Sequence, residues 1–382
     1  MTRPVLRTDL CDMLGIEYPI CMAGMGGLRG RYTPPELVAA VSEAGGLGVV
    51  GGAGIPPDDL RKAIRRVKEL TEKPFGVDLL LPVSVGKIEN TGGSGSPESP
   101  RDALRRTYPK HVEFVETLIG EFGLEKHRTE RPIRGDGEAV VRKQVDVIFE
   151  EDVPVFAAGL GDPAWVVPIA REAGAKVMGL VGNVRNAMRQ VKADVDVVVA
   201  QGTEAGGHTG KIATMPLVPQ VRDAVAPLPV VAAGGIANGT GIAAALTLGA
   251  AGVWMGTTFL TAAESGLYDR QIDSILDARS DEFVISRSYT GKTARQYKNP
   301  VVDAWENSGL EPLPMPLQGM LMADFSTAAE RAGRHDLVFT PSGQAAGLLN
   351  ESRPVAQIVE ELVSEAVSVL EAMPSRVTTS AG

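Results

Sequence analysis

The sequence contains little cysteine and no long apolar run, and both absences exclude classes of protein. Among its 382 residues only Cys11 and Cys21 are cysteines, too few for a disulfide framework in a chain of this length. No window reaches the ~18 uninterrupted apolar residues needed to cross a bilayer, and the N-terminal segment shows no signal-peptide pattern. We therefore expect a soluble, cytoplasmic protein without a membrane partner.

An excess of positive charge is also absent. The chain has 38 Lys and Arg residues against 47 Asp and Glu residues, which gives a net charge of −9. Because nucleic-acid phosphates attract clustered positive charge, we expect no nucleic-acid partner. Metal-ligand spacings such as HExxH or paired CxxC are missing, and no histidine lies near either cysteine in sequence. Neither a metal site nor a nucleophilic cysteine is expected.

Short apolar runs alternate with longer segments of helical period. Aromatic residues make up only 5% of the chain, whereas 44 Gly and 26 Pro favour many short elements joined by tight loops. The predicted strands are residues 19–22, 47–51, 75–80, 153–158, 176–180, 195–200, 229–233 and 252–256, and the predicted helices between them include 34–44, 57–70, 163–173, 183–191 and 239–248. Eight such units predict an α/β fold, a (β/α)8 TIM barrel, with an open doubly wound sheet as the alternative. Thr33, Asp162 and Asn238 are expected to cap helices.

Two regions interrupt this alternation. Residues 82–142 form an insertion that begins with a Gly/Ser stretch at 91–97 and continues with a helical pattern at 108–122. We interpret it as a helical lid over a ligand, with a simple spacer as the alternative. Residues 265–372 form a mostly helical C-terminal appendage with amphipathic stretches at 321–332 and 355–370, a candidate surface for a homodimer. The barrel then comprises residues 1–81 and 143–264, and residues 373–382 are a loose tail.

Glycine is concentrated where predicted strands end. Function in a barrel lies in the loops after the strands. Backbone N–H groups at Gly234 and Gly235 after the seventh strand, and at Gly256 and Thr257 after the eighth, are arranged as in an anion nest. Tight turns alone would explain any one of these glycines, but both pairs together favour a phosphate. Such a site holds a phosphosugar, a nucleotide or FMN without selecting among them.

The loop after the sixth strand contains a histidine. Gly206 and Gly207 let the backbone pass close to a flat ligand, and His208 then faces the barrel mouth as a candidate acid–base group. Glu204 in the same loop either orients the backbone or a ligand, or is solvated. The other three histidines lie in polar surroundings of the insertion and the appendage. We interpret those three as surface residues.

The same loop carries a family resemblance. Residues 200–210 read AQGTEAGGHTG and resemble the signature of the nitronate monooxygenase family, formerly called 2-nitropropane dioxygenases. Further agreement lies at residues 15–20, 24–25, 39–48, 74–77, 233–236, 249–250 and 255–257. The members of that family are FMN-dependent barrels. The resemblance therefore implies a flavoprotein oxidoreductase that oxidises alkyl nitronates with O2 to a carbonyl compound and nitrite.

The resemblance also implies roles for individual residues. His208 is the catalytic base that takes a proton from neutral nitroalkanes. The implied FMN contacts are Ala23, Gly24, Met25, Asp78, Gln201, Gly206, Gly207, Gly234, Gly235, Gly256 and Thr257. Asp78 departs from the asparagine usual in the family, and Met22 from a glutamine. An ionised aspartate only accepts hydrogen bonds, whereas asparagine also donates them, so we expect this position to treat the flavin differently.

Two other functions fit the same scaffold. In one, NAD(P)H reduces FMN and the electrons pass to an enoyl thioester or a quinone, since barrels of this kind also resemble enoyl-carrier-protein reductases. A bulky substrate would suit the insertion and Asp78. In the other, the protein is a non-catalytic flavin-binding protein, for which His208 has no purpose.

Overall fold

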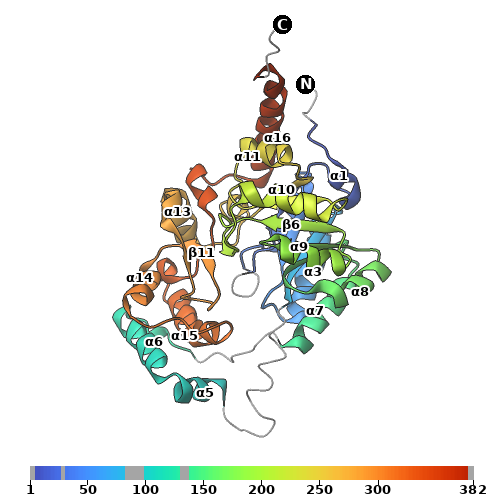
Figure 1. Ribbon diagram of the computed structural model, residues 1–382. Coiled ribbons are helices and arrows are strands. Elements are labelled where there is room, and N and C mark those ends of the chain that lie inside the picture. Colours follow the sequence, from blue (N-terminus) through green and yellow to red (C-terminus); the bar gives the residue numbers. More distant parts are fainter. Residues whose placement is uncertain (1–4, 27–30, 82–98, 130–136, 377–382) are drawn as a thin grey trace.

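Eight parallel strands close into a barrel in the computed structural model, which describes residues 5–26, 31–81, 99–129 and 137–376 (Figure 1). The strands are β1 (Ile20–Met22), β2 (Gly48–Gly51), β3 (Phe75–Leu81), β4 (Val155–Gly161), β5 (Lys176–Val181), β6 (Val197–Gln201), β8 (Val230–Ala233) and β9 (Gly252–Met255). Their order is β1-β9-β8-β6-β5-β4-β3-β2. A parallel bridge between Cys21 and Leu47 joins the two ends of this order. The predicted TIM barrel is confirmed, and the open doubly wound sheet is wrong.

Helices surround the barrel. They are α2 (Pro35–Glu43), α3 (Pro57–Leu70), α7 (Glu138–Glu150), α8 (Val167–Glu172), α9 (Val184–Lys192), α10 (Thr214–Val225) and α11 (Gly239–Thr247). The last long helix, α16 (Val355–Ala372), packs against α11 and α2. The short helix α1 (Asp9–Leu14) contributes Leu10 and Leu14 to the core inside the barrel. No helix in the described ranges combines the length and the apolar character needed to span a membrane.

Strand residues alternate between two cores. In β6, Val198 packs under the outer helices, whereas Val197 and Val199 pack inside the barrel. Successive side chains of a strand point to opposite faces, and here both faces are covered. All three valines are therefore fully buried. This double burial explains why the strands read as continuous apolar runs in the sequence.

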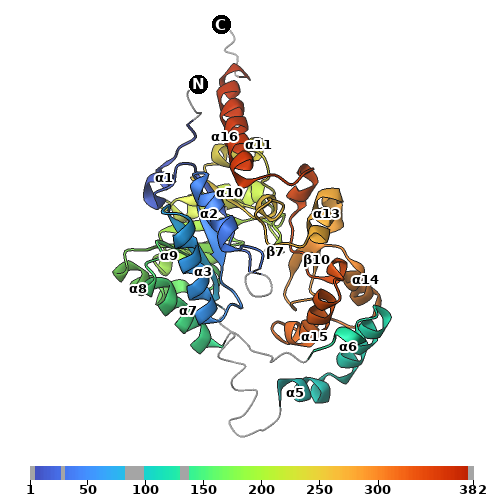
Figure 2. The same cartoon turned by 180° about the vertical axis from the view of Figure 1, so that it is seen from behind.

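The insertion and the appendage share a second core. Helices α5 (Pro100–Thr107) and α6 (Pro109–Glu121) lie beside α14 (Pro300–Asn307) and α15 (Leu317–Arg331), away from the barrel (Figures 1 and 2). Leu118 from the insertion and Trp305 and Phe325 from the appendage are among its buried members. Arg101 of α5 is hydrogen-bonded to Asp324 of α15 at 2.9 Å. Residues as far apart in sequence as Arg101 and Asp324, 223 positions, thus stabilise each other.

Parts of the predicted domain division fall outside the described residues. These parts are residues 1–4 and 27–30 of the barrel, residues 82–98 (with the Gly/Ser stretch at 91–97) and 130–136 of the insertion, and residues 377–382 of the tail. Residues Met373–Arg376 form a short 3-10 helix. The domain boundaries after residues 81, 142, 264 and 372 stay predictions.

The appendage contains strands that the sequence did not indicate. β10 (Phe283–Ser286) and β11 (Ala294–Tyr297) pair antiparallel, and β11 also pairs with β7 (Gly207–His208). The appendage is mostly helical, as predicted, and these two strands are an addition that the sequence analysis did not predict. Both strands are short. β10 is partly exposed, and the buried residues of β11 include Arg295 and Gln296, so neither strand has the buried apolar run that marked the barrel strands. Their pairing connects the appendage to the loop that carries His208.

Two of three predicted helix caps are present. The side chains of Asp162 and Asn238 accept hydrogen bonds from Ala164 N and Gly241 N. Thr33 does not cap α2, because its hydroxyl donates to Met25 O at 3.0 Å and accepts from Gly51 N at 2.8 Å. Thr33 instead joins the loops that follow β1 and β2 at the barrel mouth.

Candidate active site

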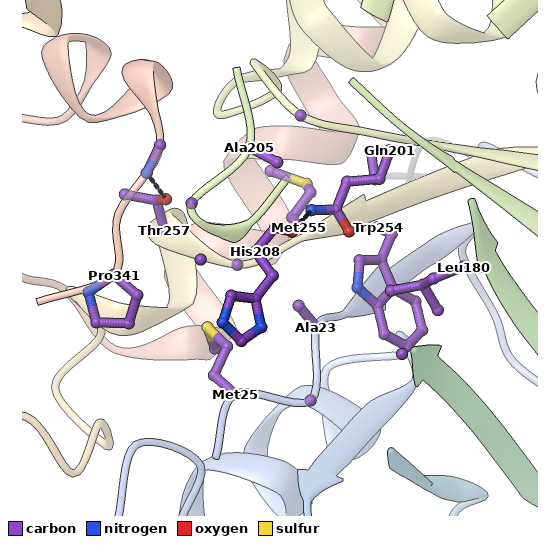
Figure 3. A pocket seen from close by; sticks show the side chains of 18 of the residues that line it. Ala23, Met25, Leu180, Gln201, Ala205, His208, Trp254, Met255, Thr257 and Pro341 are labelled. Carbon is purple, nitrogen blue, oxygen red and sulfur yellow. Dashed lines mark hydrogen bonds between the residues drawn. The ribbon is translucent and has the colours of Figure 1, made fainter. Parts of the chain in front are cut away.

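A cavity of about 290 Å3 opens where the barrel strands end. It is lined by residues of the strand-end loops and by a segment of the appendage (Figure 3). All twelve site residues proposed from the sequence line it, namely Ala23, Gly24, Met25, Asp78, Gln201, Gly206, Gly207, His208, Gly234, Gly235, Gly256 and Thr257. The structure thus brings them together, while their individual roles stay predictions.

Backbone amides after β8 and β9 are available to an anion. Gly234 and Gly235 have φ angles of +98° and +75°, in the region that favours glycine. Their N–H groups meet no acceptor among the described residues, and neither do those of Gly256 and Thr257. Amides left without partners at a helix start and in a left-handed turn form a concave donor surface. This arrangement fits a phosphate group.

The loop after β6 is held from several sides. The Gln201 side chain donates to His208 O at 2.8 Å. The carboxylate of Glu204 accepts from Thr214 N at 3.0 Å and from the Thr214 hydroxyl at 2.9 Å. Glu204 therefore anchors the start of α10, and it also lines the cavity. A Cβ on Gly206 would come within 2.8 Å of Gly343 N, so the appendage packs directly on this loop.

His208 projects into the cavity from β7 (Figure 3). Its Nε2 lies 3.2 Å from the hydroxyl of Thr290. That hydroxyl also lies 3.1 Å from Lys292 O, to which it can donate its one proton; in that arrangement Nε2 is the donor to Thr290. The Nδ1 lone pair is then left to accept a proton.

Burial keeps the imidazole of His208 neutral. Burial, with a smaller contribution from the charge of Lys292, lowers its pKa from 6.5 to about 4. Burial also lowers the pKa of the Lys292 ammonium. At neutral pH, His208 is therefore an acceptor of protons rather than a cation.

Asp78 is the second ionisable group of the site. Its side chain is 8% exposed, and its Oδ1 has no hydrogen-bond partner. Burial raises its pKa well above the ordinary value, against a smaller opposing effect of the Gly159 backbone amide. The sequence-based expectation of an ionised aspartate at this position conflicts with that environment.

The sequence did not indicate the contribution of the appendage. Phe339, Pro341, Gly343 and Ala345 line the cavity, as does Tyr32. The Tyr32 hydroxyl donates to Phe339 O at 2.6 Å, and Gly343 N donates to the Thr257 hydroxyl at 2.9 Å. The residues near 340 carry no motif, and only the tertiary fold brings them to the barrel mouth.

The described part of the insertion and the two cysteines do not line this cavity. Within residues 99–129 and 137–142, no part of the insertion lines it. The lid therefore stays a prediction. Cys11 and Cys21 are buried in the barrel interior, and burial raises the pKa of the Cys21 thiol. Across the described part of the chain, no three His, Cys, Asp or Glu side chains are grouped to hold a metal ion.

Comparisons with known proteins agree on one family. The family described as nitronate monooxygenase matches residues 7–365. A Mycobacterium tuberculosis protein named as a monooxygenase, Rv1533, is 37% identical over 96% of this chain and 98% of its own length. A Staphylococcus aureus protein named as a nitronate monooxygenase is 31% identical over 96% of this chain and 99% of its own length.

Solved structures are similar over the whole chain as well. A nitroalkane oxidase from Streptomyces ansochromogenes has a TM-score of 0.79 at 29% identity, covering 96% of this chain and all of that one. FabK from Thermotoga maritima has a TM-score of 0.75 at 32% identity, covering 97% of this chain and all of that one. These similarities extend across the barrel and the appendage together.

Proposed function

The chain belongs to the nitronate monooxygenase family of oxidoreductases, and we propose that it binds FMN and oxidises alkyl nitronates with O2 to a carbonyl compound and nitrite. Its substrate is accordingly a small molecule. The observation that carries the proposal is one cavity that combines backbone amides without acceptors among the described residues with a partly buried, neutral histidine. The nitroalkane oxidase with a similar structure supports the same substrate class.

The residues of the cavity fit FMN in two respects. The amides of Gly234, Gly235, Gly256 and Thr257 would hold the phosphate, because these donors otherwise lack acceptors. Gly24 lies so close to Asp78 that a Cβ on Gly24 would come within 2.4 Å of the Asp78 Cβ. This part of the cavity wall therefore has no room for a side chain, and its flat backbone surface suits the flavin ring. When bound, FMN supplies the electron transfer between substrate and O2.

The protein itself contributes proton transfer and an apolar enclosure. His208 Nδ1 would accept the proton from the carbon that bears the nitro group of a neutral nitroalkane, while Nε2 stays fixed on Thr290. Met25, Leu80 and Leu180 make the cavity wall apolar, and Phe339 and Pro341 extend that wall from the appendage. Such a lining excludes water from the reacting carbon.

The test is turnover by the FMN-loaded protein. With the anion of nitroethane we expect oxygen uptake and one nitrite released per substrate consumed. If nitronates leave the flavin oxidised without oxygen while NADH or NADPH reduces it rapidly, the enoyl or quinone reductase replaces this proposal. If no donor reduces bound FMN, the protein is a non-catalytic flavin-binding protein. A purified protein that takes up no FMN would end all three ideas.

A further inference from the structure

Asp78 differs from Glu204, the other acidic residue of the cavity, because its buried Oδ1 has no hydrogen-bond partner. Glu204 is fixed by the amide and hydroxyl of Thr214. Asp78 is more than nine-tenths buried, lines the same cavity, and leaves Oδ1 without a hydrogen bond. A buried polar atom without a partner costs free energy unless a ligand or a proton satisfies it.

The side chain of Asp78 points to the inside of the barrel. Its neighbours in β3, Val77 and Leu79, pack under the outer helices, and successive strand residues face opposite ways. Its partners in the neighbouring strands are Gly51 of β2 and Ala157 of β4, and Ala157 packs inside the barrel. Asp78 is therefore directed away from the charged residues of α3 and α7 and toward the cavity.

No cation compensates a charge at this position among the described residues. The strands β2 and β4 and residues 23–26 contain no ionisable side chain. The titratable groups that share the cavity are Tyr32, Glu204 and His208. Tyr32 is buried and its pKa is raised, and Glu204 carries the same sign of charge as an ionised Asp78. The histidine is neutral because its pKa is lowered to about 4, so it offers no countercharge.

Glycines surround the carboxyl group closely. A Cβ on Gly24 would lie 2.4 Å from the Asp78 Cβ, and a Cβ on Gly159 would lie 2.7 Å from Oδ1. Both approaches are far below van der Waals contact. The carboxyl group therefore occupies a slot that only two residues without side chains allow.

We propose that Asp78 is a neutral carboxylic acid in the folded protein and that it serves the flavin as both a hydrogen-bond donor and an acceptor. The second half of this inference rests on the proposed function. A carboxylic acid has one donor and one acceptor end, as a side-chain amide has. Asp78 would then reproduce the asparagine of the family that the sequence resembles, without a negative charge beside the flavin.

The test compares FMN affinity of the wild-type protein and Asp78→Asn from pH 5 to 9, measured by quenching of flavin fluorescence. Asparagine keeps the shape, the donor and the acceptor but does not titrate. We expect dissociation constants that agree within threefold at pH 7. If the acid titrates within this range, wild-type affinity falls tenfold per pH unit above its pKa, while the variant stays level. Asp58→Asn, the same change on an exposed position of α3, is the control.

Two results would overturn the inference. Tenfold tighter binding by Asp78→Asn at pH 7 would mean that a carboxylate repels the flavin. Tenfold weaker binding by that variant at every pH would mean that the ionised group is required. The ratio of the two proteins cancels the titration of the flavin and of His208, because both share these groups.

Infrared spectroscopy tests the protonation state without any flavin. In flavin-free wild-type protein with 13C-labelled aspartate, we expect the carbonyl band of a protonated carboxyl at pH 7, and its loss in Asp78→Asn. If the variant does not fold, the carbonyl band of the wild-type protein and its response to pH still show whether a protonated carboxyl is present. Absence of the band at pH 7 would refute the neutral acid, whether or not FMN binds and nitronates turn over.

Discussion

Replacing His208 and Thr290 separately distinguishes a proton acceptor from a structural residue. A neutral nitroalkane must lose a proton before oxidation, whereas its nitronate has already lost it. We therefore expect His208→Ala to lower kcat/KM for nitroethane by about 10²- to 10⁴-fold, the range for a positioned general base. The same change should alter kcat/KM for the nitronate far less.

The expected effect of Thr290 follows from one hydrogen bond. Thr290→Val removes the hydroxyl that lies 3.2 Å from His208 Nε2. A partly buried hydrogen bond contributes about 0.5–1.5 kcal/mol, which corresponds to a roughly twofold to tenfold loss. This loss should be confined to nitroethane, because Thr290 acts only by holding the imidazole orientation and tautomer.

The assay is steady-state oxygen uptake by FMN-loaded protein, with nitroethane and its pre-formed anion measured side by side. Flavin content is determined for each variant, so that lost cofactor is not mistaken for lost catalysis. Equal losses for both substrates in His208→Ala would refute the role of His208 as a base. An unchanged ratio in Thr290→Val would refute the positioning role of Thr290.

Three further predictions concern cofactor binding and stability. Gly235→Ala should weaken FMN binding about tenfold, measured by fluorescence quenching, because a side chain at a φ of +75° costs about 1–2 kcal/mol and displaces a phosphate donor. The control is Gly309→Ala, which has a similar φ of +70° but lies in open space and should leave the FMN affinity unchanged. Equal FMN affinities of the two variants would contradict the amide site. His208 has a folded pKa of about 4, below that of the unfolded chain, so its contribution to stability is complete above pH 6.5 and lost as the pH falls. Relative to His208→Asn, the wild-type protein should lose up to about 3 kcal/mol of unfolding free energy between pH 6.5 and 4 in urea titrations, and parallel pH profiles would disprove this. Phe325→Ala should lower the unfolding free energy by about 3–5 kcal/mol, because its fully buried ring belongs to the core shared by the insertion and the appendage. A loss below 1 kcal/mol would show that this core is not tightly packed.

The barrel could be predicted because its strands are buried on both faces. Runs such as residues 197–200 are apolar throughout, and each predicted strand overlaps an observed one within a few residues. The strands β10 and β11 were not predicted because neither has a continuous apolar run. Ile285 of β10 is exposed, and β11 is a four-residue strand that contains Arg295. Their stability comes from pairing across the molecule, which local sequence does not encode.

The candidate site was predictable where glycines and the histidine directly follow barrel strands. Gly234, Gly235 and His208 lie where the chain must turn at the strand ends, and closure of the barrel brings these ends together. Phe339 and Pro341 could not be found in the same way, because they reach the cavity from the appendage. The neutral state of Asp78 was missed because it depends on neighbours that only the folded barrel supplies.

The phosphate contribution is measured most directly by comparing FMN with riboflavin, which has the same ring system but no phosphate. Hydrogen bonds to a charged group contribute about 1.5–3 kcal/mol each, so the amides of Gly234, Gly235, Gly256 and Thr257 predict FMN binding at least about a hundredfold tighter than riboflavin. Equal affinities for the two flavins in isothermal titration would contradict the phosphate site on which the flavoenzyme proposal depends.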